Sequence, residues 1–289
     1  MATLRDIRRR ISSVKSTQQI TRAMKMVAAA KLRRAQEKIL KARPYAYELR
    51  NVIGHLANIV DHDAHPLLSV REVQSVGFVV VTSDRGLCGA FNINIIRRAT
   101  EQIKAAQAEG KSAKLILVGK KARDYFRRRD YEIIAEHIDL FNKLDFSHAQ
   151  ALAGDITRFY TQGEVDLVSV IYNEFKSAVQ QNLTVEQLLP IEPKSIEGST
   201  LKFNYIYEPS PDTIINVLLP RQINIQTWRI LLETSSAEHG ARMTAMEVAT
   251  ENAQEMITDL TLHYNRVRQA SITKEILEII GGAEALKTQ

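Results

Sequence analysis

The apolar positions of the first sixty residues recur three or four residues apart. This spacing is typical of an α-helix that packs one face along another helix. Polar residues Gln18 and Thr21 interrupt the stripe, which then resumes in a shifted phase and so predicts a local stutter in the packing. The stripe consists of Leu4, Ile7, Ile11 and Val14, followed by Ile20, Met24 and Val27.

Good helix formers dominate this first segment. No glycine precedes Gly54, and Pro44 is the only proline among the first sixty residues. Because proline removes an amide donor and crowds the preceding turn, we expect a kink or a break at Pro44. About 55 helical residues would span about 80 Å, which is longer than an ordinary globular helix.

The chain shows the same kind of periodicity again from residue 212 onward. Between Pro220 and Gly281 there is no proline and a single glycine, Gly240. Apolar residues there fall on alternating steps of three and four over more than four heptads, which predicts a coiled-coil helix of about 90 Å. The expected seam is Met246, Ala249, Ala253, Met256, Leu260, Val267, Ala270 and Leu277, with His263 and Lys274 at two further positions.

The middle of the chain alternates short apolar runs with longer amphipathic stretches. Such alternation predicts crossover units and a largely parallel sheet. The expected strands are 76–82, 114–119, 131–138 and 165–175, with further candidates at 183–191 and 201–207. The expected helices are 92–108, 120–129 and 146–161.

The two terminal helices each carry an apolar stripe that needs cover, so they can pair with each other. We therefore predict an α+α/β chain: a long antiparallel coiled coil of N- and C-terminal helices plus a central Rossmann-like α/β domain. The expected segments are an N-terminal coiled-coil helix at 1–60, an α/β domain at 75–208 and a C-terminal coiled-coil helix at 209–289.

Charge is unevenly distributed along the 289 residues. Residues 1–50 hold 14 Lys and Arg against three Asp and Glu, whereas the whole chain has a net charge of only +6. An acidic partner is therefore expected for the N-terminal segment: nucleic acid, anionic lipid or an acidic protein surface. No apolar stretch is long enough to span a membrane, and the N-terminus lacks the apolar core of a secretory signal.

Glycine-rich phosphate loops are not matched in this sequence. The turn Gly86–Gly89 lacks the G-x-G-x-x-G spacing of a dinucleotide site. The tripeptide Gly110–Ser112 resembles the end of a P-loop, but Ala105 stands where the first glycine belongs and a predicted helix precedes it.

Other candidate chemistry also favours the structural interpretation. Cys88 is the only cysteine, so it cannot form an internal disulfide, and no nearby histidine would activate it as a nucleophile. His62, Asp63 and His65 have metal-binding side chains, but a solvated loop explains them better. We therefore expect no catalytic residue, no cofactor and no metal.

Two other function classes fit parts of the pattern. The basic clusters Arg8–Arg10 and Lys31–Arg34 suit the phosphate contacts of a nucleic-acid-binding protein, but no aromatic residue precedes Tyr45 to stack on bases. Such a protein would bind duplex DNA with a steep salt dependence. A doubly wound enzyme with helical arms would instead bind a nucleotide tightly.

Three segments closely resemble the gamma subunits of F-type ATP synthases. The similarity extends over essentially the whole chain, and the C-terminal segment is long and irregular enough to be specific. Residues 191–199 depart most from the family pattern, and the resemblance assigns them no role. The three segments are Ser16–Ala29 (STQQITRAMKMVAA), Asp84–Gly89 (DRGLCG) and Arg268–Ala283 (RQASITKEILEIIGGA).

This resemblance implies a central-stalk rotor subunit that is not itself an enzyme. In that role the paired helices turn inside a ring of alpha and beta subunits, and the α/β domain lies near the epsilon subunit and the membrane c-ring. Proton flow through the c-ring would turn the shaft and drive ATP synthesis in the ring. The resemblance also implies a peripheral position at the cytoplasmic face of the cell membrane, reached only through the complex, and no nucleic-acid partner.

The resemblance assigns partner contacts to individual residues. Met24 and Lys25, together with Arg242 on the C-terminal helix, would pass acidic loops of the beta subunits. The single Cys88 differs from the regulatory cysteine pair of chloroplast relatives, which implies no thiol regulation. Further contacts with the alpha/beta ring would be Arg268, Gln269 and Thr273, and contacts with the c-ring and epsilon subunit would be Tyr205, Tyr207 and Glu208.

Overall fold

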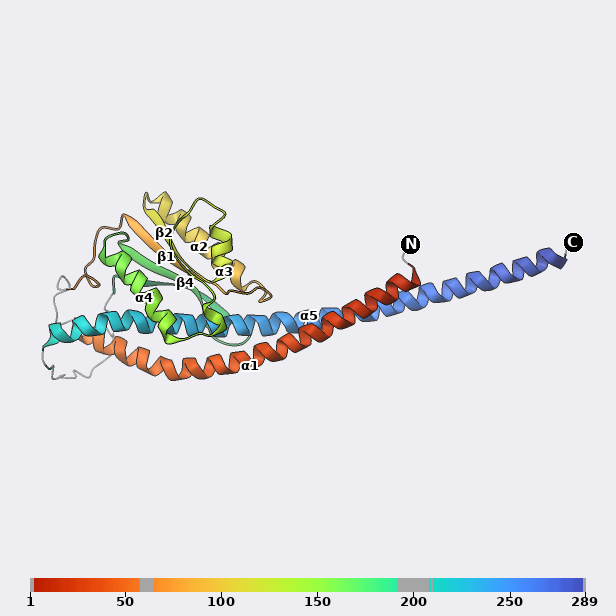
Figure 1. The fold of residues 1–289 in the computed structure, drawn as a ribbon, viewed down its shortest axis with the longest axis horizontal. Coiled ribbons are helices and arrows are strands. Elements are labelled where there is room, and N and C mark those ends of the chain that lie inside the picture. Colours follow the sequence, from red (N-terminus) through yellow and green to blue (C-terminus); the bar gives the residue numbers. More distant parts are fainter. Residues whose placement is uncertain (1–2, 58–64, 192–207, 209, 288–289) are drawn as a thin grey trace. The chain divides into compact units, whose positions relative to one another are not determined.

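The computed structural model describes residues 3–57, 65–191, 208 and 210–287 (Figure 1). The chain divides into two compact units. We call residues 1–27 with 243–289 the helical unit, and residues 28–242 the sheet unit. Two long helices, α1 (Leu4–Ala57) and α5 (Pro211–Lys287), contribute residues to both units.

A five-stranded sheet forms the centre of the sheet unit, with the strand order β3-β2-β1-β4-β5. The first four strands in this order are parallel, and β5 runs antiparallel to β4. The predicted strands are confirmed apart from small shifts at their ends, except for 201–207, which lies outside the described residues. The strands are β1 (Ser75–Val81), β2 (Ser112–Val118), β3 (Glu132–His137), β4 (Leu167–Phe175) and β5 (Gln181–Leu189).

Helices cover both faces of this sheet. Because side chains alternate along a strand, Val79 and Val81 of β1 face one apolar cluster, and Phe78 and Val80 face the other. The first cluster is closed by α4 (Phe146–Thr161) and by the parts of α1 and α5 that belong to the sheet unit. The second is closed by α2 (Phe91–Ala108) and α3 (Lys120–Phe126).

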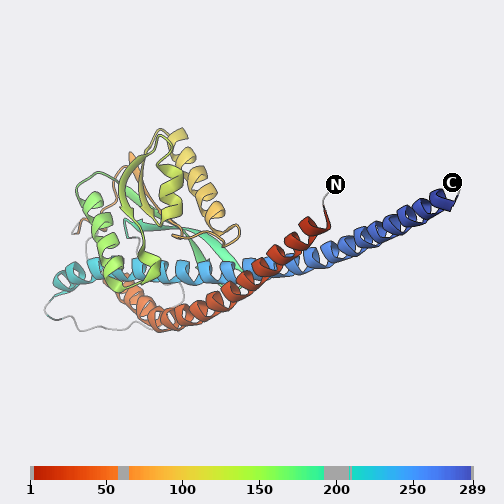
Figure 2. The ribbon, with the colours of Figure 1, turned by 45° about the vertical axis from the view of Figure 1, so that its right-hand side comes forward.

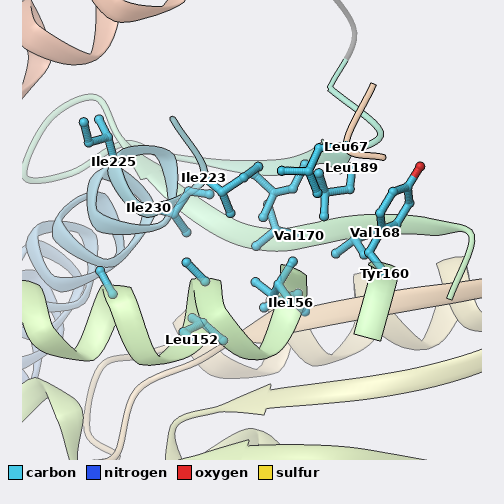
Figure 3. Packing of buried hydrophobic residues seen from close by; sticks show 14 of the residues in the cluster. Leu67, Leu152, Ile156, Tyr160, Val168, Val170, Leu189, Ile223, Ile225 and Ile230 are labelled. Carbon is cyan, nitrogen blue, oxygen red and sulfur yellow. The ribbon is translucent and has the colours of Figure 1, made fainter. Parts of the chain in front are cut away.

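The first cluster is an apolar core that joins the sheet to the helices (Figure 3). Leu152 and Ile156 of α4 lie beneath Val170 of β4, and Ile223 and Ile230 of α5 reach the same layer. All five side chains are almost fully buried, so the start of α5 is fixed to the sheet by apolar packing.

Pro44 does not break α1, which runs without interruption from Leu4 to Ala57. Of the two outcomes predicted for Pro44, a kink or a break, the break is therefore wrong. Ala46, Leu49 and Ile53, which follow the proline, are all buried in the first cluster. This packing holds the helix in place and compensates for the backbone hydrogen bond that Pro44 cannot make.

Among the helices that the structure describes, none combines the length and the apolar character needed to cross a membrane.

Candidate functional site on the paired helices

Four side-chain contacts align α1 with α5 in the helical unit. Residue numbers rise along α1 as they fall along α5, so the two helices are antiparallel, as predicted (Figures 1 and 2). The contacts are Arg8 Nη2 to the Tyr264 hydroxyl at 2.9 Å, Gln18 Nε2 to Gln254 Oε1 at 2.9 Å, Thr21 Oγ1 to Thr250 Oγ1 at 2.8 Å, and Lys25 Nζ to Glu247 Oε1 at 2.5 Å.

The seam between the helices therefore carries three polar pairs within about two turns, beside the buried Ala253. We call the six residues Gln18, Thr21, Lys25, Glu247, Thr250 and Gln254 the polar belt. Polar side chains in a seam form directional bonds and so define one register, at some cost in stability compared with apolar packing. The belt thus specifies which residues of α1 and α5 face each other.

The predicted stutter in α1 is wrong. The least exposed positions keep one heptad phase through Gln18, Thr21 and Lys25, whereas Ile20 and Val27 are 58% and 57% exposed. The apolar residues were expected to fill the seam, but the polar residues fill it because each finds a hydrogen-bonding partner on α5.

The predicted seam of α5 is correct at every second position from Met246 to Val267, whereas the predicted Lys274 and Leu277 are exposed. Met246 and Ala253 are buried, and Leu260 and Val267 are shielded, as expected. The positions between them are displaced by one residue, since Ile257 is buried while the predicted Met256 is 46% exposed. The same displacement makes Tyr264, which bonds Arg8, a seam residue in place of His263, and makes Thr250, which bonds Thr21, a seam residue in place of Ala249.

Large apolar side chains face outward around the polar belt. Met26 is 63% exposed and Val248 is 49% exposed, in addition to Ile20, Val27 and Met256. We call these five residues the outer apolar set. A surface that exposes apolar groups while its seam is polar is typical of a segment that another protein covers.

The last part of α5 extends beyond the beginning of α1 (Figures 1 and 2). The contact of Arg8 with Tyr264 places Leu4, the first residue of α1, close to the level of Arg268. We call residues 269–287 the overhang. Its large apolar side chains are about half exposed or more: Ile272, Ile276, Leu277, Ile279 and Ile280.

The predicted contact residues fall into separate groups. Met24 is partly exposed, and Lys25 is held by Glu247 in the polar belt. Arg268, just before the overhang, and Gln269 and Thr273, within it, are all exposed. Glu208 is exposed, whereas Tyr205 and Tyr207 lie outside the described residues.

Arg242 lies in the sheet unit and is engaged there. Only 11% of its side chain is exposed. Its Nη2 donates to Glu238 Oε1 at 2.7 Å and to the carbonyl oxygen of Gly86 at 3.1 Å. Arg242 therefore connects α5 to the turn that follows β1, a bond that the sequence pattern did not indicate.

Burial perturbs the ionisable groups around Arg242. Burial raises the pKa of Glu238, and the charge of Arg242 opposes this rise. Burial, followed by the positive charges of Arg242 and Lys31, lowers the pKa of His239 to about 4. The Cys88 thiol is almost fully buried, and burial raises its pKa, so it has the environment of a packed side chain, as predicted.

A second buried carboxylate was missed by the sequence analysis. Glu233 of α5 is almost fully buried, accepts from Arg43 Nη2 of α1 at 2.9 Å and accepts from the Phe175 amide at the end of β4 at 3.1 Å. Its position within the buried run Ile230–His239 was the available signal, because a buried acid requires a partner.

The carboxyl edge of the parallel strands is where open α/β sheets bind ligands. Here Asp84, just after β1, accepts from the backbone amides of Lys120, Asp139 and Phe141 at 3.1, 3.0 and 3.3 Å. These amides include the first one of α3, so the protein's own carboxylate occupies a position suited to an anion. The end of β1 and the start of α3 can lie this close together because residue 119 is a glycine. A Cβ there would lie 2.3 Å from the Thr82 carbonyl oxygen.

Metal-binding side chains do not cluster in the part of the chain that the structure describes. No three His, Cys, Asp or Glu residues among those described are placed so that they could hold a metal ion. His62 and Asp63 of the loop considered above lie outside the described residues, and His65 Nδ1 accepts from the amide of Leu67 at 3.1 Å.

Comparisons with known proteins agree with the resemblance noted from the sequence. A family model described as ATP synthase matches residues 3–286. The chain is 54% identical over 291 residues to the ATP synthase gamma chain of Prosthecochloris aestuarii, and 99% of each chain is covered. It is 52% identical over 301 residues to the ATP synthase gamma chain of Chloroherpeton thalassium, again with 99% of each covered.

Solved structures with a similar fold come from mitochondrial ATP synthases. A chain in the central stalk and c-ring structure from Tetrahymena thermophila has a TM-score of 0.60 and 25% identity, covering 80% of this chain and 99% of that chain. A chain in the Euglena gracilis structure, in rotational state 3, has a TM-score of 0.69 and 21% identity, covering 98% of this chain and 94% of that chain. The second likeness concerns the fold alone.

Proposed function

This chain belongs to the family of ATP synthase gamma chains, the central-stalk rotor subunits of F-type ATP synthases, and we propose that its helical unit carries the contacts with the catalytic ring. As a rotor subunit it transmits torque between the membrane c-ring and the alpha/beta ring during proton-driven ATP synthesis. The observation that carries the proposal is the helical unit itself, in which a polar seam registers two helices and apolar side chains face outward.

The polar belt suits torque transmission. Directional bonds between Gln18 and Gln254 and between Thr21 and Thr250 oppose sliding of one helix along the other. The two helices then turn as one body, because rotation of either one carries its hydrogen-bonding partners with it. The outer apolar set would face the surrounding ring, where weak contacts can be made and released in turn.

The overhang would be held by the ring. A single exposed helix is marginally stable in water, and the isoleucines of residues 269–287 gain stability only when a partner covers them. We assign contacts with the alpha/beta ring to Gln269 and Thr273 of this segment and to Arg268 just before it, all of which are exposed.

Contacts with acidic loops of the beta subunits are proposed for Met24, Lys25 and Arg242. The pair of Lys25 with Glu247 is partly exposed, so Lys25 can exchange one carboxylate for another at low cost. Arg242 would have to leave Glu238, whose buried carboxylate would then lose its charged partner. Lys25 is therefore the more available of the two cations.

A second set of proposed contacts joins the subunit to the membrane part of the complex. We assign contacts with the c-ring and the epsilon subunit to Tyr205, Tyr207 and Glu208, following the family resemblance. Association with the cytoplasmic face of the cell membrane would then pass through these partners. We also propose that the subunit is not catalytic, and the occupation of the sheet edge by Asp84 supports this assignment.

Assembly with the ring tests the proposal. The chain is co-expressed with alpha and beta subunits, and the complex is purified and tested for ATP hydrolysis, which the chain alone should lack. The variant Leu277→Asp in the overhang should lower the yield of the complex strongly, because it places a charge where the ring covers apolar surface. The matched variant Asn265→Asp, on the exposed side of the paired region, should assemble normally. Equal yields for the two variants would contradict the assigned role of the overhang.

A further inference from the structure

An aromatic hollow opens on the sheet unit where α1, α4 and α5 meet. The hollow is open to solvent on one side and has a volume of about 460 Å³, within the range of small-molecule sites. The polar belt and the overhang, which serve the proposed rotor contacts, are not part of it. The hollow is lined by Tyr45 of α1, Phe146 and Gln150 of α4, and Arg221, Asn224 and Trp228 of α5.

Rings form its walls. Phe146 and Trp228 meet edge to face, with ring centroids 5.9 Å apart and planes at 85°. Tyr45 and Phe146 remain 46% and 38% exposed, although aromatic rings of this size usually bury most of their surface in a core. Ile225, which is buried, adds an apolar surface to the lining. This lining favours a flat apolar group.

A single cation faces the hollow without a carboxylate. The guanidinium carbon of Arg221 lies 5.5 Å from the centre of the Tyr45 ring. Among the described residues, no acidic side chain forms an ion pair with Arg221. Arg229, which also lines the hollow, is neutralised, because both oxygens of Glu186 accept from its Nη2 at 2.8 and 2.6 Å. The hollow therefore complements one negative charge.

We propose that this hollow binds a small planar aromatic anion. Its ring lies against Trp228 and Phe146, and its carboxylate or similar group bonds the guanidinium of Arg221, with the amides of Asn224 and Gln150 available for further polar groups. Such a ligand contacts three helices at once, so it stabilises the base of α5 against α1 and α4. Binding in this hollow does not depend on the proposed rotor contacts.

Trp228 is the only tryptophan of the chain, so its fluorescence reports on this hollow directly. The probe is 4-nitrobenzoate, a planar aromatic anion that quenches indole emission, and 4-nitrobenzamide is its neutral analogue of the same shape. Titration of the full-length chain should give saturable quenching by 4-nitrobenzoate. The amide should bind about tenfold more weakly, because it lacks the charge that bonds Arg221.

Two charge-matched variants locate the anion. Arg221→Gln should weaken 4-nitrobenzoate binding about tenfold and leave the amide unaffected. Arg97→Gln removes the same charge from an exposed position of α2 and should bind both probes as the unaltered chain does. Circular dichroism checks that both variants fold alike. The proposal is overturned if quenching does not saturate, if the amide binds as well as the anion, or if Arg221→Gln binds the anion undiminished.

Discussion

Lys25 and Glu247 form an ion pair across the seam of the helical unit, while 38% and 43% of their side chains remain exposed to solvent. Water and salt screen an exposed pair, so this one contributes about 0.5 kcal/mol or less. The pair therefore aligns the two helices without holding them together strongly. This combination suits the contact with acidic loops of the beta subunits that we propose for Lys25.

A double-mutant cycle measures this weakness. We expect Lys25→Ala and Glu247→Ala each to change the melting temperature of the chain only slightly, with a coupling energy below about 1 kcal/mol. The coupling should disappear in about 1 M salt. Thermal melts of the two single variants and the double variant, at low and high salt, give this value. A coupling energy of several kcal/mol that persists in salt would show that the pair contributes strongly to the stability of the helical unit.

Thr21 and Thr250 offer a test of the belt's cost in stability. Three hydrogen bonds are geometrically possible, from Thr21 to the Gln18 carbonyl, from Thr250 to the Met246 carbonyl, and between the two hydroxyls. Two hydroxyl protons cannot make all three bonds at once. The double variant Thr21→Val with Thr250→Val should therefore raise the melting temperature by a few degrees, because valine has the same shape and needs no partner.

The control for this variant is Thr258→Val, which changes an exposed hydroxyl of α5 in the same helical unit. It should leave the melting temperature unchanged within about one degree. If the double variant melts earlier than the unaltered chain, the hydroxyl contact contributes more than apolar packing at that position, and our view of the belt is incorrect.

Met24→Lys tests the proposed contact with the ring. An added cation beside Lys25 can bind stationary acidic groups of the beta subunits and hold the shaft at one angle. We expect the complex to assemble normally but to pump fewer protons for each ATP hydrolysed. Gln107→Lys, on the exposed side of α2, is the control for added charge and should leave this ratio unchanged. An unaltered ratio in Met24→Lys would count against the contact.

His239 predicts a pH dependence of stability in the sheet unit. Its pKa falls to about 4 in the folded chain, because burial and the charges of Arg242 and Lys31 disfavour its protonation. A base with a lowered pKa stabilises the fold above its ordinary pKa, near 6.5, and this contribution is lost as the pH falls toward 4. The full loss is about 3 kcal/mol. Glu238 acts in the opposite direction, because its raised pKa favours the folded state at low pH.

Two histidine variants separate the contribution of His239 to the pH dependence of stability from that of Glu238. His239→Gln keeps a neutral side chain at all pH values, so its stability should fall less than that of the unaltered chain between pH 6.5 and 4. His263→Gln, on the exposed side of the helical unit, should behave as the unaltered chain does. Parallel pH profiles for all three proteins would show that His239 is readily protonated in place.

The regular elements could be predicted because their patterns are local. Helix α4 was expected at 146–161 and occupies Phe146–Thr161, since its apolar spacing and its capping residue Asp145 lie within one stretch of sequence. Strand β1 was recognisable as a continuous apolar run, because both faces of a parallel strand are covered. Such signals need no knowledge of the partner element.

The seam could be predicted only in part because two helices decide it together. Along α5, Met256 and Ile257 are adjacent and both apolar, so either can continue the heptad from Ala253. The choice of Ile257 depends on which residues α1 presents opposite. In α1, apolar Ile20 was favoured over polar Thr21, although Thr21 finds its partner in Thr250, more than two hundred residues away.

The candidate contacts were accessible from family resemblance and not from pattern. Exposure of Arg268 agrees with a surface role, but the bond of Arg242 to Gly86 depends on how the turn after β1 meets α5. The periodicity of α5 does not predict the contact between Arg242 and the turn after β1. The aromatic hollow was likewise invisible, because Tyr45, Phe146 and Trp228 are far apart in the sequence and converge only through the fold.

The overhang has a consequence for the cell that makes this protein. A newly synthesised chain that has not met its ring displays a row of isoleucines, and such surfaces are recognised by chaperones and degraded or aggregated when they stay uncovered. Surplus copies would therefore be short-lived. If the ring covers the overhang as proposed, production of this subunit would have to keep pace with that of the ring subunits, and the uncovered helix end would limit the number of unassembled copies.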